Sequence, residues 1–246
     1  MKKIICLASF LSFAIAFSQH HHWGYEGQES PEHWGEIEEG KQCGIGKLQS
    51  PININISQTV INKKLPKILF NYGDGSVNTI IDNGHSLEFD FKQGSSIIYD
   101  HKVYNLVQFH AHEESEHTID GIRFPLELHF VHKAEDGSVL VIGVFVKQGN
   151  ENSYFEKLKI FKTLAKNGKV NTEVNFNPEK MYPKDKSYYH YLGSLTTPPC
   201  VENVNWIIFK NPITMSIEEI EEIAKHLPKN NNRPIQPVNG REILHN

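Results

Sequence analysis

Strand-like segments in the middle of the chain constrain the fold more than any other feature of this sequence. In them, apolar and polar residues alternate or β-branched and aromatic residues predominate, as is typical of β-strands. These segments are residues 87–91, 102–112, 126–132 and 139–146. Asp136 and Gly137, between the last two, are typical of a tight turn, so we expect those two strands to pair antiparallel.

Helical patterns are confined to residues 152–166 and 216–227. The second segment begins with Ser216 and Glu219 at the three-residue spacing of a capping box. The first carries an apolar stripe made of Phe155, Leu158, Phe161 and Leu164.

No internal repeat, long charge block or flexible linker divides the sequence. We therefore predict a mainly β (α+β) fold in which residues 19–246 form a single domain. A large, mostly antiparallel twisted central sheet with a few peripheral helices is the architecture that these patterns favour.

The first residues have the features of a secretory signal peptide. Lys2 and Lys3 precede the uncharged, mostly apolar residues 4–17, and Ala16-Phe17-Ser18 offers a cleavage site. The apolar run is shorter than the roughly 20 residues that span a bilayer, and no later segment competes with it. We predict that residues 1–18 are removed and that the mature chain is periplasmic or secreted, with no membrane span.

Charge and cysteine content agree with an exported protein. The formal charge is −4 and becomes more negative without the two lysines, so the chain lacks the basic surface of nucleic-acid-binding proteins. Cys6 would leave with the signal peptide, which leaves Cys43 and Cys200 in an oxidising compartment. We expect these two to form one disulfide bond, the alternative being two separate buried thiols.

Three histidines have the spacing of a metal site. His110 and His112 are two apart in a strand and so leave the same face, and His129 lies in a second strand that could run beside the first. Three imidazoles with an open fourth position are typical of catalytic zinc. By strand parity, Gln108 shares the face of the first pair and Glu127 that of His129, where each could orient a ring. An isolated His-x-His is more often an exposed pair, so this pattern alone leaves both interpretations open.

Four blocks of sequence resemble, in order and spacing, the signature motifs of the alpha carbonic anhydrases, in particular the secreted bacterial type. They are Gln-Phe-His-Ala-His at 108–112, Ser-Glu-His-Thr at 115–118, Glu-Leu-His-Phe-Val-His at 127–132 and Gly-Ser-Leu-Thr-Thr-Pro-Pro-Cys at 193–200. The resemblance continues through residues 22–25, 49–54, 83–85 and 232–237 and so covers nearly all of the mature chain.

The resemblance implies an enzyme that reversibly hydrates carbon dioxide to bicarbonate and a proton by attack of a zinc-bound hydroxide. It assigns one Zn²⁺ per chain to His110, His112 and His129. Thr196 matches a threonine that accepts a hydrogen bond from the hydroxide and donates one to the carboxylate matching Glu116, which aims the nucleophile. Without the resemblance, Glu116 would be read as a surface carboxylate and Thr196 as a turn residue.

Carbon dioxide is apolar, so its pocket should be a hydrophobic wall beside the metal. Val131, Val141, Leu195 and Trp206 match that wall in the family, and Thr197 would meet bicarbonate. Strand parity places Val131 on the face of His129 independently. For Val141 and Trp206, packing in the core explains the residue type equally well.

A proton must leave in every turnover, and a side chain that titrates near neutral pH is a suitable carrier. His85 matches the proton carrier of the family, and Tyr25 and Asn83 match residues that hold the intervening water molecules. The histidines at 20–22 stand beside the predicted mature terminus, where we expect them in solvent.

The resemblance also implies ligands beyond the substrate. Anions and sulfonamide-type inhibitors would bind at the metal, weak ester hydrolysis would be a side activity, and a homodimer is one assembly that the family allows. Ala111 and Glu113 depart from the residues common in the family, but neither is a predicted ligand. Two alternatives keep the fold without this enzymology: a catalytically silent binding protein, or a metal scavenger that uses residues 20–22 and other surface histidines.

Overall fold

The computed structural model describes residues 23–73 and 75–246. The predicted signal peptide, residues 1–18, and the histidines at 20–22 therefore lie outside the described residues. Within the described part of the chain, no helix has the length and apolar character needed to cross a membrane.

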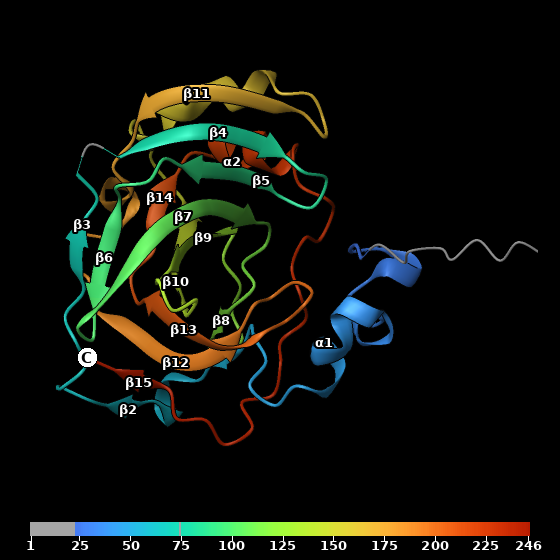
Figure 1. The fold of residues 1–246 in the computed structure, drawn as a ribbon, viewed down its shortest axis with the longest axis vertical. Helices are drawn as coiled ribbons and strands as arrows, with labels where there is room; N and C mark the ends of the chain where they lie inside the picture. The colour runs from blue at the N-terminus through green and yellow to red at the C-terminus, as the bar shows by residue number, and fades with distance from the viewer. Residues whose placement is uncertain (1–22, 74) are drawn as a thin grey trace, which may run out of the picture.

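A large twisted sheet, with 13 strands in the described residues, forms most of the molecule (Figure 1). Its main path is, in order, β11 (Lys169–Asn175), β4 (Ser76–Asp82), β5 (Leu87–Phe91), β7 (Lys102–His112), β9 (Leu126–Lys133), β10 (Val139–Gln148), β13 (Glu202–Phe209), β12 (Tyr188–Ser194), β15 (Leu244–His245) and β2 (Val60–Ile61). Off this path, β14 (Ile213–Met215) pairs with β10, while β6 (Ser96–Tyr99) pairs with β7 and with β3 (Leu69–Asn71). A separate parallel pair joins β1 (Asn53–Ile54) to β8 (Thr118–Ile119).

Most neighbouring strands are antiparallel, as predicted. The parallel pairs in the large sheet are β10 with β13, β10 with β14, and β15 with β2. The predicted segments 87–91 and 102–112 coincide with β5 and β7, and the other two are extended by one residue in β9 and two in β10. β9 and β10 pair antiparallel around the Asp136-Gly137 turn, which confirms that prediction.

The helices are short and peripheral. The two α-helices are α1 (Lys41–Ile45) and α2 (Ile217–Ala224) in the described residues. The 3₁₀ helices are η1 (Gly27–Glu29), η2 (Trp34–Glu36), η3 (Glu38–Gly40), η4 (Ile56–Gln58), η5 (Phe155–Thr163) and η6 (Pro178–Met181).

The two predicted helices differ in outcome. α2 begins after Ser216, and the capping box forms: the backbone N–H of Glu219 donates to Oγ of Ser216 at 3.2 Å, and that of Ser216 donates to the Glu219 carboxylate at 2.8 Å. Residues 152–166 contain only the 3₁₀ helix η5, not an α-helix. The apolar stripe explains the difference, because its members recur at every third residue, which matches the three residues per turn of a 3₁₀ helix.

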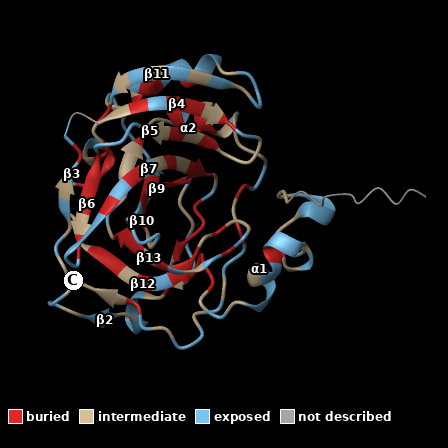
Figure 2. Ribbon diagram, in the orientation of Figure 1, coloured by how far each residue is buried: buried red, intermediate tan, exposed pale blue. Residues whose placement is uncertain are grey.

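One face of the sheet packs on a large aromatic core. Phe89 of β5 stacks on Phe109 of β7 at 4.4 Å between ring centroids, and η5 and α2 cover this face with Phe161 and Ile223. Figure 2 shows the buried residues concentrated in the central strands, with exposed residues along the outer elements. Burying each large apolar side chain of this kind stabilises the fold by about 1.5–3 kcal/mol.

A bulge in β7 determines which residues face this core. The register with β9 shifts between Leu106 and Gln108, so Val107 is the extra residue. Before the bulge Leu106 points into the core, and after it Phe109 and Ala111 do. The even-numbered residues beyond the bulge therefore face away from the aromatic core, toward the other side of the sheet.

A second, smaller hydrophobic cluster lies on that other side. It contains Val141 and Phe145 of β10 and Trp206 and Ile208 of β13, with Ile54 beside them. The N-terminal segment is tied to the sheet by the predicted disulfide bond, which forms between Cys43 in α1 and Cys200 after β12, with Cα atoms 5.1 Å apart.

Candidate active site and metal centre

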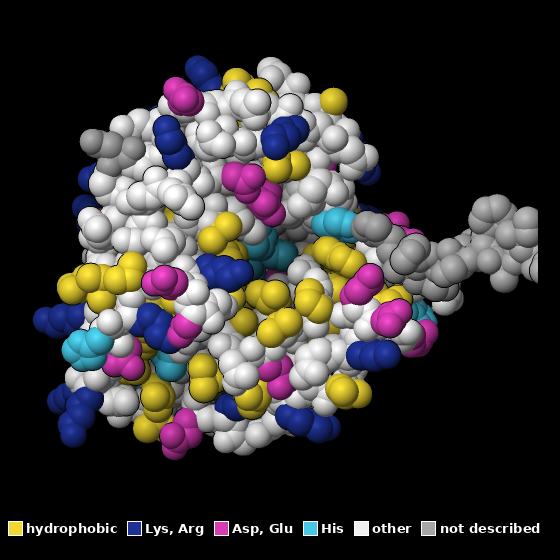
Figure 3. Space-filling model, viewed as in Figure 1, with side chains coloured by type: hydrophobic (Ala, Val, Ile, Leu, Met, Phe, Trp, Pro, Cys, Tyr) yellow, Lys and Arg dark blue, Asp and Glu magenta, His cyan; other side chains and the backbone are white. Residues whose placement is uncertain are grey.

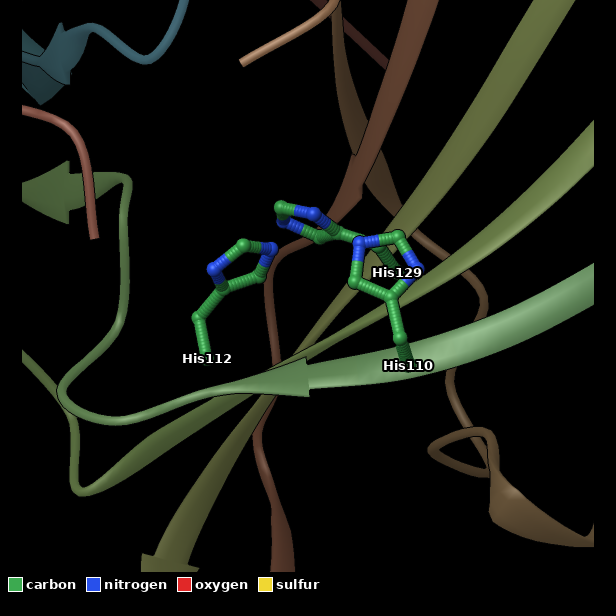
Figure 4. Close-up of side chains that lie close together, drawn as sticks. All are labelled: His110, His112 and His129. Carbon is green, nitrogen blue, oxygen red and sulfur yellow. The ribbon is translucent and has the colours of Figure 1, made fainter. Parts of the chain in front are cut away.

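Three histidine rings converge on the sheet face opposite the aromatic core. His110 and His112 project from the same side of β7, and His129 is the direct cross-strand partner of His110 in β9 (Figure 4). One nitrogen from each ring lies within 4.8 Å of the others, and the ring centroids are 4.6 to 5.4 Å apart. The predicted convergence of the three side chains is thus present.

The outward-facing ring nitrogens are held by oxygen atoms. Nδ1 of His110 lies 2.8 Å from Oε1 of Gln108, and Nδ1 of His112 lies 2.6 Å from the backbone carbonyl of Asn231. An oxygen acceptor requires N–H at these atoms, which leaves a lone pair on Nε2 of each ring. The Gln108 contact was predicted; the Asn231 carbonyl was not, because a backbone acceptor carries no signature in the side-chain sequence.

Glu127 occupies the corresponding position for the third ring. Its Oε1 lies 2.9 Å from Nε2 of His129, off the line of a hydrogen bond, and 2.8 Å from Nδ1 of His117. Burial alone would raise the pKa of Glu127, but the two histidines hold it well below its usual value. The ionised carboxylate therefore favours Nε2–H on His129 and turns Nδ1 toward the other two rings.

A buried chain of polar groups continues behind Glu127. Nε2 of His117 lies 2.6 Å from the hydroxyl of Tyr191, which lies 2.8 Å from Oγ of Ser50. The backbone N–H of His117 also donates to Glu127, at 2.8 Å. Sequence reasoning assigned no role to these three residues, although His117 lies in one of the recognised blocks.

The donor set fits a zinc ion. Nε2 of His112 is buried and has no hydrogen-bond partner, which is costly for a polar atom unless a ligand takes its lone pair. Burial lowers the pKa of His110 and of His112, so both rings are neutral near pH 7. Neutral imidazoles at this mutual distance are the ligands that zinc prefers.

Glu116 is fully buried beside this cluster. Its Oε1 accepts a hydrogen bond from the backbone N–H of Arg233 at 2.9 Å. Its Oε2 lies 3.5 Å from Nε2 of His112 and 3.8 Å from Nδ1 of His129 and accepts no hydrogen bond. The hydrogen bond from Thr196 implied by the resemblance is therefore not formed, because Oε2 is turned toward the ring nitrogens instead.

The four predicted wall residues belong to one hydrophobic cluster, which reaches His129 through Trp206. Val131, Val141 and Trp206 are consecutive cross-strand partners in β9, β10 and β13. The ring of Trp206 lies 4.9 Å from that of His129 between centroids, and Leu195 packs against the same hydrophobic cluster. Figure 3 shows a hollow in this face with histidine side chains at its floor and hydrophobic side chains along one side.

The predicted threonines follow β12. Thr196 is buried, and Thr197 is half-buried and accepts a hydrogen bond from the backbone N–H of Cys200 at 2.9 Å. The disulfide bond at Cys200 thus lies in the same short turn as both threonines.

His85 lies in the turn between β4 and β5. Oδ1 of Asn83 accepts hydrogen bonds from the backbone N–H groups of His85 and Ser86, at 3.0 and 2.8 Å, and so shapes this turn. The half-buried ring of His85 stacks on Trp23 at 3.9 Å between centroids.

Tyr25 belongs to the aromatic group around Trp23. Its ring makes edge contacts with Trp23 and Trp34 at 5.8 and 5.7 Å. Burial, and then the negative charge of Glu116, raise the pKa of Tyr25 well above its usual value. The phenol is thus within electrostatic reach of the carboxylate beside the histidines.

One acidic residue near the site was not predicted. Glu88 is the cross-strand partner of His110 in β5, and its Oε2 accepts a hydrogen bond from Nε2 of Gln108 at 3.3 Å. Burial, followed by the neighbouring Asp90, raises the pKa of Glu88 to about 7.

Comparisons with known proteins agree with this geometry. Residues 29–246 match the family model described as eukaryotic-type carbonic anhydrase. A carbonic anhydrase of Pectobacterium atrosepticum is 36% identical over 252 residues, covering 100% of both chains. The solved alpha carbonic anhydrase of Thermovibrio ammonificans, in complex with the inhibitor sulfanilamide, is 40% identical with a TM-score of 0.86, covering 91% of this chain and 99% of the other. A hyperthermostable carbonic anhydrase from a hydrothermal vent chimney is 43% identical with a TM-score of 0.85, at the same coverage.

Proposed function

Because the chain belongs to the eukaryotic-type carbonic anhydrase family and is an enzyme of carbon dioxide hydration, we propose that it works with one zinc ion per chain, held by His110, His112 and His129. The observation that carries this proposal is the convergence of three ring nitrogens within 4.8 Å, together with the buried Nε2 of His112, which has no hydrogen-bond partner. When bound, zinc with three protein ligands makes a coordinated water acidic enough to act as a nucleophile near neutral pH, a property for which carbonic anhydrases are the standard example.

Gln108, Glu127 and the Asn231 carbonyl orient the three rings in this proposal. Their contacts with the outward-facing nitrogens fix the tautomers that leave lone pairs pointing inward. Oε2 of Glu116 is buried beside the rings and accepts no hydrogen bond in the described structure; in this proposal it would turn to accept one from the Thr196 hydroxyl, and the two together would aim the attacking oxygen.

Carbon dioxide would lie against Val131, Val141, Leu195 and Trp206. The first two and Trp206 form an apolar row across three strands, next to His129. An apolar wall suits a substrate that offers almost no hydrogen bonds, and Thr197 supplies polar atoms for bicarbonate. We place the proton path at His85, with Tyr25 and Asn83 holding water, because imidazole titrates near neutral pH and His85 is half-buried in a turn.

Zinc content and turnover of the mature protein test this assignment together. The wild-type protein should retain one zinc per chain and hydrate carbon dioxide. His110→Ala should lose both, because only two imidazoles remain. His33→Ala is the matched control, since the ring of His33 is partly exposed in the N-terminal segment and pairs with Glu36, with Nδ1 3.0 Å from Oε1. Wild-type turnover in His110→Ala would refute the ligand assignment, and several weakly held ions per wild-type chain would favour a metal scavenger.

We also propose that residues 1–18 direct export and that the mature protein is periplasmic or secreted. The Cys43–Cys200 disulfide bond supports an oxidising compartment. Cell fractionation with N-terminal sequencing tests this: a chain that keeps Met1 in the cytoplasm would exclude it.

Sedimentation of the mature protein tests the homodimer that the family allows.

Inhibitor binding gives an independent probe of the metal centre. The Thermovibrio ammonificans enzyme was solved with sulfanilamide, and we propose that sulfonamides and small anions bind this chain at the three histidines. Titration with sulfanilamide should inhibit the zinc-loaded wild-type protein, and His110→Ala should not bind the compound.

A further inference from the structure

A buried carboxylate adjoins the turn that carries His85. Asp82 is the last residue of β4, and its side chain is almost completely inaccessible to solvent. β4 pairs with β5 on one side and with β11 on the other (Figure 1). A buried ionisable group is costly unless its oxygen atoms are fully used, so the partners of Asp82 indicate its task.

One oxygen of Asp82 joins two turns. Oδ1 accepts hydrogen bonds from the backbone N–H groups of Gly84 and Asn167, both at 3.1 Å. Gly84 lies in the turn of His85 and Asn167 in the turn that leads into β11. The two turns approach so closely that a Cβ on Gly84, whose φ is +82°, would lie 2.7 Å from Oδ1 of Asn167.

The other oxygen faces the segment after α2. Oδ2 lies 3.3 Å from Nδ1 of His226, and both side chains are largely buried. His226 is itself fixed: its backbone N–H donates to Ile223 at 3.0 Å, and its ring meets that of Phe161 at 5.7 Å. The carboxylate therefore connects the turn of His85 to the turn before β11 and to the segment after α2.

We propose that Asp82 is a positioning residue for proton transfer, fixing the turn of residues 83–86 so that His85 keeps its place against Trp23. The inference rests on the proposed role of His85 as the proton carrier. Proton transfer depends steeply on the placement of donor and acceptor. Without Asp82, the N–H groups of Gly84 and Asn167 lose their acceptor, and the turn gains alternative conformations.

Steady-state kinetics separate this role from a general loss of structure. Conversion of carbon dioxide precedes removal of the proton, so slower proton removal lowers kcat and leaves kcat/KM unchanged. In weak buffer, Asp82→Ala should lower kcat by about 3- to 10-fold, within the 100-fold or more that a positioned proton carrier supplies. Added imidazole should restore kcat, because a buffer molecule then replaces His85.

The variant set uses the zinc-loaded mature protein. Asp82→Asn keeps an oxygen acceptor for both N–H groups and should recover most of the loss. Asp136→Ala is the matched control, because Asp136 also accepts a hydrogen bond from a turn N–H, that of Ser138 at 3.0 Å, but lies in the β9–β10 turn. Combining Asp82→Ala with His85→Ala should lower kcat no further than His85→Ala alone.

Every other outcome would count against the positioning role of Asp82 or against the role of His85. Equal losses of kcat and kcat/KM in Asp82→Ala, no loss of kcat, or an additional loss in the His85→Ala background would overturn the positioning role. If His85→Ala itself keeps normal kcat in weak buffer, the proton-carrier role fails first, and this result is distinct from a failure of Asp82 alone. Should Asp82→Ala not fold, as judged by thermal unfolding and zinc content, Asp82→Ser is the substitute: its Oγ stands one bond short of the position of Oδ1, so it does not replace the acceptor of the two N–H groups and should show the same selective effect on kcat.

Discussion

Gly143 of β10 lies directly opposite His129 of β9, where any side chain would displace its neighbours. A Cβ at this position would come within 2.9 Å of Oε1 of Glu127 and 2.6 Å of Cδ1 of Ile208. The absence of a side chain therefore leaves the space in which the Glu127 carboxylate contacts His129 and His117.

Gly143→Ala should consequently weaken zinc binding as well as stability. Overpacking of this kind costs about 1–3 kcal/mol, and displacement of a group that orients a metal ligand typically costs about 10- to 100-fold in metal affinity. Zinc dissociation into a chelator measures the second effect. Gly149→Ala is the control, because the nearest atoms to its Cβ would belong to the Thr214 side chain, at 2.8 Å; comparable zinc loss in both variants would contradict the argument.

Tyr191→Phe should destabilise the protein by about 1–3 kcal/mol, because the buried Nε2 of His117 loses its partner and Oγ of Ser50 loses the phenol, keeping the hydrogen bond from the backbone N–H of Ser194. Urea unfolding measures this change. In a double-mutant cycle, Ser50→Ala should cost less in the Tyr191→Phe background than in the wild type. Additive effects would show that the two hydroxyl groups do not act as a unit.

Removal of the disulfide bond should lower the free energy of unfolding by about 2–5 kcal/mol. Urea unfolding of the Cys43→Ser/Cys200→Ser variant and of the oxidised wild type measures this loss. The wild type under reducing conditions should unfold like the variant. Because Cys200 lies in the turn after Thr196 and Thr197, the variant should also lose turnover at temperatures well below its midpoint of unfolding. Unchanged stability would show that the N-terminal segment is held by other contacts alone.

Strand parity predicted which histidines share one face of the sheet, because these residues lie in regularly paired parts of β7 and β9. His110, His112 and Gln108 stand beyond the bulge at Val107, so their alternation is unbroken up to the end of β7. Had the bulge fallen between the histidines, the same sequence pattern would have placed them on opposite faces. The bulge itself left no clear sign in the sequence.

The rest of the site comes from segments that only the fold brings together. The Asn231 carbonyl reaches His112 across 119 positions, and Tyr191 reaches His117 across 74. Local sequence patterns carry no information on such contacts. They also do not reveal that the space beside Gly143 is needed by the Glu127 carboxylate. The helical pattern at 152–166 does give a helix, over Phe155–Thr163, but the sequence did not reveal its type: an apolar repeat of three residues suits three residues per turn and the helix is 3₁₀.

A buried histidine outside the site makes stability depend on pH. His132 lies in the aromatic core, with Nε2 2.9 Å from the Tyr72 hydroxyl and Nδ1 2.9 Å from the Phe130 carbonyl, and burial lowers its pKa to about 3 from 6.5. Between these values the unfolded chain binds a proton that the folded protein does not. Stability due to this residue is therefore complete above pH 6.5 and is lost as the pH falls toward 3, at up to about 1.4 kcal/mol per pH unit.

His132→Gln removes the titrating group and retains polar atoms near Tyr72. We expect it to be less stable than the wild type at pH 7, because the amide does not reproduce both contacts of the ring. The difference should shrink as the pH is lowered to 5, since only the wild type then loses stability through protonation of His132 in the unfolded chain. Urea unfolding of the zinc-free proteins at pH 7, 6 and 5 measures this, with metal loss removed as a contribution. Parallel pH dependence in the two proteins would show that His132 titrates normally in the folded state.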